Sequence, residues 1–237
     1  MNNAELIPLT NLLIAFLPVA ILISVLHAWG LNASQAVYAN IRMLLQLLIV
    51  GYVLTFIFET DRFSIVLLVI VFMIGVSSWI AMRPLPDRGI KALFIIMSAL
   101  GISGLAVLIL ITQVVLNLSK GYEPSIVIPI AGMIFANSMN TISPVGERLH
   151  SELKQDPNFT RARAISLETA MIPQINALLA VGLVSLPGMM TGQILAGIEP
   201  IIAAGYQIVV MCMIFASAGL SAAIYLAMKK PEKESIS

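Results

Sequence analysis

The stretch FSIVLLVIVFMIGVSSWIAM, residues 63–82, contains twenty residues without a charge and is bounded by Arg62 and Arg83. A helix needs about 20 predominantly apolar residues to cross the hydrocarbon core of a bilayer. Seven stretches of at least sixteen residues are free of charge in this way: 6–41, 43–58, 63–82, 92–119, 124–146, 169–198 and 200–228. We therefore expect an all-α polytopic integral membrane protein with about seven transmembrane helices.

The composition supports a single transmembrane domain over residues 1–237. Apolar residues make up 59% of the chain and charged residues 11%, against about 45–50% and about 25% in soluble domains. No segment between the expected spans is long enough for a soluble nucleotide-binding or receptor domain. The single Cys212 excludes an intramolecular disulfide, and the net charge of +1 gives no reason to expect nucleic acid. The spans are expected near 6–28, 37–58, 63–82, 91–117, 126–143, 164–186 and 200–228.

The lysines and arginines predict the topology, because basic residues in short loops stay on the cytoplasmic side. With the N-terminus outside and the C-terminus inside, eleven basic residues are cytoplasmic, and Arg62 and Lys120 are external. Span 124–146 is the weakest, since it contains three prolines and several amides and hydroxyls, and it could be re-entrant. We expect a multi-pass protein of the plasma or inner cell membrane.

The longest cytoplasmic segment is expected at 144–163 and begins as an amphipathic helix. Ser143 suits an N-cap and Pro144 the first helical position. Two readings remain open: a helix lying on lipid headgroups through its apolar stripe, or a docking helix for a cytoplasmic partner. The stripe is Val145, Leu149 and Leu153, and the charged face includes Glu147, Arg148 and Glu152, of which the last two are spaced to form an ion pair.

Two further segments concentrate polar or soft side chains. In GMIFANSMNTIS, residues 132–143, the side chains of Asn137, Asn140 and Thr141 share one helical face. Because lipid-facing amides are costly, we expect them to contact other helices or to line a translocation path.

The other segment is LPGMMTGQILAG, residues 186–197, which is too apolar for an ordinary loop and suggests a re-entrant or closely packed element. The thioethers of Met189 and Met190 suit soft or borderline metals, although methionines also fill packed junctions. Gln193 is a third candidate for the path. Expected helix-packing positions are Gly188, Gly192, Gly197 and Pro173.

Three strings carry a family resemblance: RMLLQLLIVGYVL at 42–54, GMIFANSMNTIS at 132–143 and LPGMMTGQILAG at 186–197. They resemble the FetB family of permease subunits of ABC-type metal exporters, a family that also includes plant aluminium-tolerance permeases. This chain departs from the family pattern at residues 155–160, QDPNFT, where relatives tend to have the small residues Gly-Ala before the sixth span.

The resemblance implies a permease that exports iron or a related metal cation with a separate cytoplasmic ABC ATPase, as two permeases and two ATPases. The chain contains no phosphate-binding loop, so catalytic residues and cofactors are expected to be absent from it, and ATP and Mg²⁺ would bind the partner. The contacts with the ATPase would come from Glu147, Arg148, Leu149 and Glu152. Alternatives are a permease for an organic substrate such as a nucleotide sugar, and a stand-alone carrier or channel, which the lack of an acidic or histidine residue near any span centre disfavours.

Overall fold

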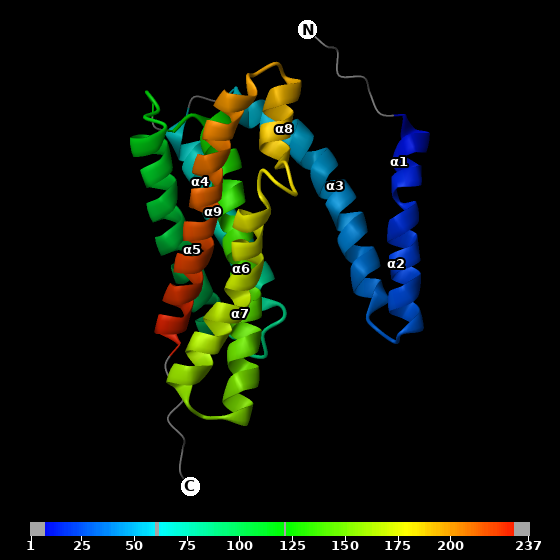
Figure 1. Cartoon of the computed structure of the whole chain (residues 1–237), viewed down its shortest axis with the longest axis vertical. Helices are drawn as coiled ribbons and strands as arrows, with labels where there is room; N and C mark the ends of the chain where they lie inside the picture. Colours follow the sequence, from blue (N-terminus) through cyan, green and yellow to red (C-terminus); the bar gives the residue numbers. More distant parts are fainter. Residues whose placement is uncertain (1–7, 60–61, 121, 230–237) are drawn as a thin grey trace. The chain divides into compact units, whose positions relative to one another are not determined.

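The computed structural model describes residues 8–59, 62–120 and 122–229, which are almost entirely helical. The chain divides into two compact units, Met1–Glu59 and Thr60–Ser237. Each unit is described by itself below, and Figure 1 labels the helices of both.

The first unit is a helical hairpin. Two helices, α1 (Leu9–Ala15) and α2 (Leu17–Ala28), are followed by α3 (Ala33–Phe58). The side chain of Asn32 caps α3 by accepting a hydrogen bond from the Gln35 amide at 3.2 Å. The expected span at 6–28 is found as Thr10–Ala28, and its residues 6 and 7 lie outside the described residues. The described residues of α2 and α3 include none that is buried, as expected for apolar helices whose solvent is lipid.

The second unit is a bundle in which the long helices run side by side (Figure 1). It begins with α4 (Phe63–Met82) and α5 (Ile90–Ile109), which continues into a π-helical turn, η1 (Leu110–Val115). The remaining helices are α6 (Pro124–Gln155), α7 (Phe159–Ala180), α8 (Gly188–Leu195) and α9 (Pro200–Met228). Helix α8 is short and lies at the end of the bundle where α9 begins (Figure 1).

Small residues form much of the bundle core. Ala81, Ala99 and Ala222 are fully buried, and larger side chains such as Ile96 and Ile142 fill the spaces between them. Between membrane helices there is little hydrophobic driving force, so close van der Waals packing by small residues stabilises the contacts. Helix α6 lies at the centre of this packing, because it contacts α4, α5, α7 and α9.

Six of the described helices, not seven, are long and apolar enough to cross a membrane, and α7 is the exception. Its first ten residues include Arg161, Arg163 and Glu168, and Gln174 and Asn176 interrupt the apolar remainder. The expected span at 164–186 also starts and ends too late, because α7 runs from Phe159 to Ala180. Within the bundle, α7 nevertheless runs antiparallel to α6 and packs against both α6 and α9 (Figure 1).

The prediction of a separate amphipathic helix that begins at residue 144 is wrong. Helix α6 continues without a break from Pro124 to Gln155, with Pro129 and Pro144 inside it. Ser143 is no N-cap, since its hydroxyl donates to the carbonyl oxygens of Ala81 on α4 (3.1 Å) and Met139 (3.2 Å). The expected span at 126–143 and the start of the cytoplasmic segment are therefore one rigid element, about 48 Å long at 1.5 Å per residue.

Candidate functional site

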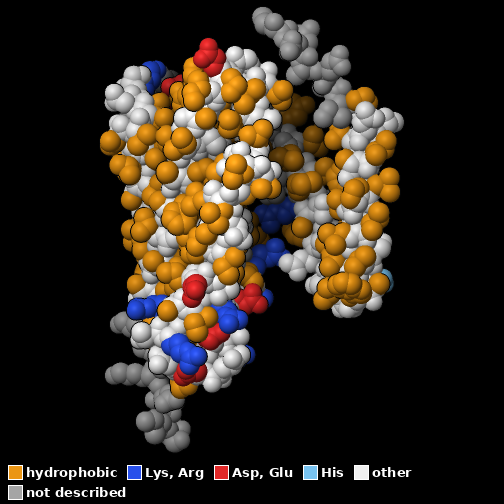
Figure 2. Space-filling view, in the orientation of Figure 1, with side chains coloured by type: hydrophobic (Ala, Val, Ile, Leu, Met, Phe, Trp, Pro, Cys, Tyr) orange, Lys and Arg blue, Asp and Glu red, His pale blue; other side chains and the backbone are white. Residues whose placement is uncertain are grey.

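Most charged side chains of the second unit gather at one end of the bundle, where α6 ends and α7 begins, and a few lie at the other end (Figure 2). The turn between α4 and α5 and the C-terminal end of α9 lie at the same end, because residues of all these segments line one pocket there. This arrangement places on one side the segments that the charge count assigned to the cytoplasm, while the orientation in the membrane stays a prediction.

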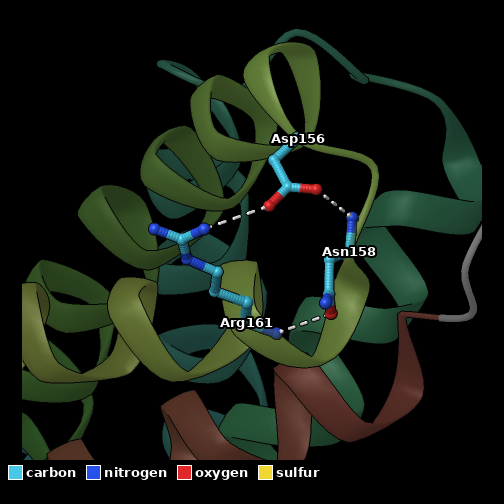
Figure 3. A network of polar contacts seen from close by, with 3 residues as sticks. All are labelled: Asp156, Asn158 and Arg161. Atoms are coloured by element: carbon cyan, nitrogen blue, oxygen red, sulfur yellow. Dashed lines mark hydrogen bonds and ion pairs between the residues drawn. The ribbon is translucent and has the colours of Figure 1, made fainter.

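The junction of α6 and α7 is held by a polar network of three residues (Figure 3). Asp156 accepts a hydrogen bond from the Asn158 amide at 3.0 Å and pairs with Arg161 at 3.4 Å. The Asn158 side chain in turn accepts from the Arg161 amide at 3.1 Å and caps α7. The unusual sequence at 155–160 is thus a defined turn with its own capping residues.

The four expected ATPase-contacting residues fall into two groups. Glu147 and Arg148 are exposed, and Arg148 forms the expected ion pair with Glu152. Leu149 is only 4% exposed and belongs to the bundle core together with Val145. The apolar stripe therefore packs inside the protein, so the alternative of a helix lying on headgroups through this stripe is wrong, and Leu149 supports the surface from within.

A cavity of about 610 Å³ lies towards the other end of the bundle. Its walls are the first turns of α6, the loop after η1, α8 and the start of α9. It brings together the thioethers of Met133 on α6 and Met189 on α8 with the amide of Gln193 and the phenol of Tyr206. Met190, the second expected soft ligand, is half-buried and does not line this cavity.

The amides and hydroxyl of α6 do not line this cavity either. Asn137 is half-buried and donates to the Met133 carbonyl at 2.8 Å, whereas Asn140 is exposed. Thr141 is buried and accepts a hydrogen bond of 3.3 Å from Gln174 of α7. Thr141 therefore makes an interhelical contact with α7, whereas Asn140 lies on the surface of the unit.

The glycines expected to permit close helix approach make no close contacts, and other glycines do. A Cβ atom built on Gly188 or Gly192 would meet no heavy atom within 4 Å, so neither marks a tight contact in the described chain. Gly197 has φ +91°, which favours glycine in the turn between α8 and α9. The tight approaches are at Gly104 and Gly146. Pro173 lies inside α7, where it removes one backbone donor.

The polar and sulfur-containing side chains named in the cavity are neutral. Among the described residues there is no group of three or more histidine, cysteine, aspartate or glutamate side chains that could hold a metal ion. Gln193 Oε1 is buried and accepts no hydrogen bond from the described residues, and Gln193 and Met189 line the same cavity. Tyr206 lines the cavity as well, although it was not among the residues expected to line the path.

Comparison with known proteins identifies the family. The profile described as Uncharacterised protein family (UPF0014) matches residues 9–163 and 158–232. The chain belongs to this family. The resemblance read from the three sequence strings is thereby confirmed.

The relatives within the family include proteins from bacteria and plants. The "Probable iron export permease protein FetB" of Escherichia coli is 36% identical, over 96% of this chain and 93% of the relative. A membrane protein of Synechocystis is also 36% identical, over 84% and 83%. The "Protein ALUMINUM SENSITIVE 3" of Arabidopsis thaliana is 30% identical, over 86% and 80%. No solved structure matches. The chain is therefore a multi-pass membrane protein of a family that includes a probable permease.

Proposed function

We propose that this chain is the permease subunit of an ATP-driven exporter, and that a separate cytoplasmic ABC ATPase supplies the energy. One observation carries the proposal: α6 is a single helix that joins the charged end of the bundle to the Met133 wall of the cavity. A partner that displaces the Glu147–Arg148 end of α6 would therefore move a wall of the cavity directly. Family membership alongside a probable permease supports the same reading.

The charged end is proposed to face the cytoplasm. It carries the exposed Arg148 and Arg161, and Lys229 follows the last residue of α9 there. Basic residues in short loops stay cytoplasmic. This orientation places the N-terminus outside and the cavity towards the external side, as an exit site for an exported substrate.

The proposed substrate is a metal cation, iron or a related metal. Met133, Met189 and Gln193 supply thioether and amide donors in the cavity, and thioethers suit soft or borderline cations. Among the described residues, the cavity lining contains no lysine or arginine, which is unfavourable for the phosphates of a nucleotide sugar. The absence of acidic residues from the same lining is unfavourable for an ion-coupled carrier.

A second permease copy is proposed to cover the polar surface of α6 and α7. Asn140 and Asn176 are both exposed on the second unit, and an amide facing lipid is costly. A pair of permeases that buries these amides, or encloses water between them, removes this cost. It also matches an assembly of two permeases and two ATPases.

The test is a binding measurement between the purified chain and its proposed cognate ABC ATPase. The double substitution Glu147→Lys, Arg148→Glu reverses two exposed charges and should weaken ATPase binding and ATP-dependent transport together. The Lys120→Glu substitution at the opposite end serves as the control and should leave both unchanged. Intact binding and transport in the double variant would show that the ATPase docks elsewhere.

A further inference from the structure

A pocket of about 380 Å³ opens at the charged end of the bundle, away from the cavity described above. Four segments that are distant in sequence form it: the α4–α5 turn, the end of α6, the start of α7 and the end of α9. Its volume falls within the range of about 300–1,000 Å³ typical of pockets that hold small molecules, so it can accept large side chains.

The walls of this pocket are apolar and firmly held. Leu85, Leu149 and Tyr225 are 3%, 4% and 2% exposed, and Leu153 and Phe159 complete the apolar lining. Because the wall residues pack against the core behind them, the pocket exists before anything binds. Sequence reasoning did not anticipate it, since its walls come from four separate segments.

The rim of the pocket is polar and fixed. Lys229 of α9 pairs with Asp87 of the α4–α5 turn at 3.4 Å, and Asp87 also accepts a hydrogen bond from the Gly89 amide at 3.1 Å. His150 lies on the exposed side of α6 beside them. An apolar pocket ringed by polar groups is the arrangement that receives a protruding anchor side chain at protein interfaces.

The charge around the pocket indicates which surface fits it. The segments 83–91 and 147–163 together with residue 229 contain eight lysines and arginines but only four acidic residues. An acyl chain would have to pass the Asp87–Lys229 pair, and a headgroup phosphate gains nothing from apolar walls. A protein surface on which an apolar side chain protrudes among acidic residues complements both the walls and the surrounding charge.

We propose that this pocket receives an apolar or aromatic anchor side chain of the partner ATPase. The proposal rests on the proposed function and deepens it: the docking surface then includes the α4–α5 turn and the end of α9 besides the α6–α7 junction. Movement of the ATPase is passed at once to three helices, α6, α7 and α9, and to the α4–α5 turn through the pocket walls.

The first experiment fills the pocket. Leu153→Trp places extra bulk in the lining, whereas Leu183→Trp adds the same side chain at an exposed position between α7 and α8, away from the charged end. In binding measurements with the proposed cognate ABC ATPase, Leu153→Trp should raise the dissociation constant by about tenfold or more, as expected for a blocked anchor. Leu183→Trp should bind like the unchanged chain. Equal binding by both variants would overturn the pocket proposal.

The second experiment is independent of whether Leu153→Trp folds. The photoreactive amino acid p-benzoylphenylalanine is introduced in place of His150 at the rim, or of Val184 at the opposite end of the bundle as a control. Irradiation of membranes should attach the ATPase to the His150 position only, through a peptide that contains an apolar residue. Attachment to lipid alone, or to a second copy of this chain alone, would overturn the proposal. If the unchanged chain binds no ATPase at all, the proposed function itself fails, which is a distinguishable result.

Discussion

Gln174 on α7 donates a hydrogen bond of 3.3 Å to the hydroxyl of Thr141 on α6. Thr141 is 1% exposed, and its own hydroxyl donates to the Asn137 carbonyl at 3.0 Å. The contact joins the most polar helix of the second unit to its central helix. Any movement of α6 is therefore shared with α7 at this level.

This contact predicts a measurable coupling between the two residues. Thr141→Val and Gln174→Leu each remove one partner of the hydrogen bond. The loss in free energy of unfolding in the double variant should be smaller than the sum of the two single losses by about 0.6 kcal/mol, which is the average for polar contacts between membrane helices. Thermal unfolding of purified variants measures it. Thr169→Val is the control, since the Thr169 hydroxyl bonds within its own helix to Ile165 at 2.8 Å; it should show no coupling to Thr141→Val.

Two glycines of α5 should respond in opposite ways to alanine. A Cβ on Gly104 would lie against the ring of Phe135 and 3.2 Å from Cγ2 of Ile134, and both side chains are buried. Gly104→Ala should therefore destabilise the protein by about 1–3 kcal/mol. A Cβ on Gly101 would meet nothing within 4 Å, so Gly101→Ala should be neutral or stabilising by about 0.5–1 kcal/mol. Unfolding temperatures that fall equally in both variants would contradict this packing.

The two neighbouring methionines of α8 should differ in transport. Met189 lines the cavity with Met133, whereas Met190 does not. Met189→Leu keeps the volume but removes the sulfur, so it should reduce metal-stimulated ATP hydrolysis by the assembled transporter severalfold, with Met190→Leu unchanged. A larger loss with Met190→Leu would contradict the placement of the path.

The ion pair at the pocket rim predicts a pH dependence in acid. The hydrogen bond from the Gly89 amide, together with the charge of Lys229, lowers the pKa of Asp87 below its usual value. A lowered folded-state pKa adds stability that is present above the usual carboxyl pKa of about 3.9 and is lost as the pH falls through the folded-state value. Asp87→Asn should therefore reduce the free energy of unfolding at pH 6 by less than about 1 kcal/mol, seen as a slightly lower unfolding temperature. The difference should vanish in strong acid, and a difference that grew there would contradict the assignment.

The spans could be predicted from sequence because charge-free length alone nearly determines them. The residues 63–82 that decide the fold form α4 with the same bounds. The break at Ser143–Pro144 was predicted wrongly, because these two residues are typical of a helix start, while their actual partners are tertiary: Ser143 bonds to Ala81, 62 positions away. Local signals cannot report such a contact.

The candidate sites were predictable only in part, for a related reason. The exposed charges of Glu147 and Arg148 and the pairing with Glu152 follow from helical spacing. The convergence of Met133 with Met189, and the pocket at Tyr225, depend on how four or more elements pack. No periodicity or spacing in the sequence predicts which of these residues lie close together.

The most direct test of the central claim is transport by vesicles of defined composition. Three sets of vesicles are prepared: with this chain alone, with the proposed cognate ABC ATPase alone, and with both. Fe²⁺ movement is followed after adding ATP and Mg²⁺. The account predicts ATP-dependent Fe²⁺ movement only when both proteins are present, and none when ATP is replaced by a non-hydrolysable analogue. Fe²⁺ movement by this chain alone, without the ATPase or ATP, would contradict it.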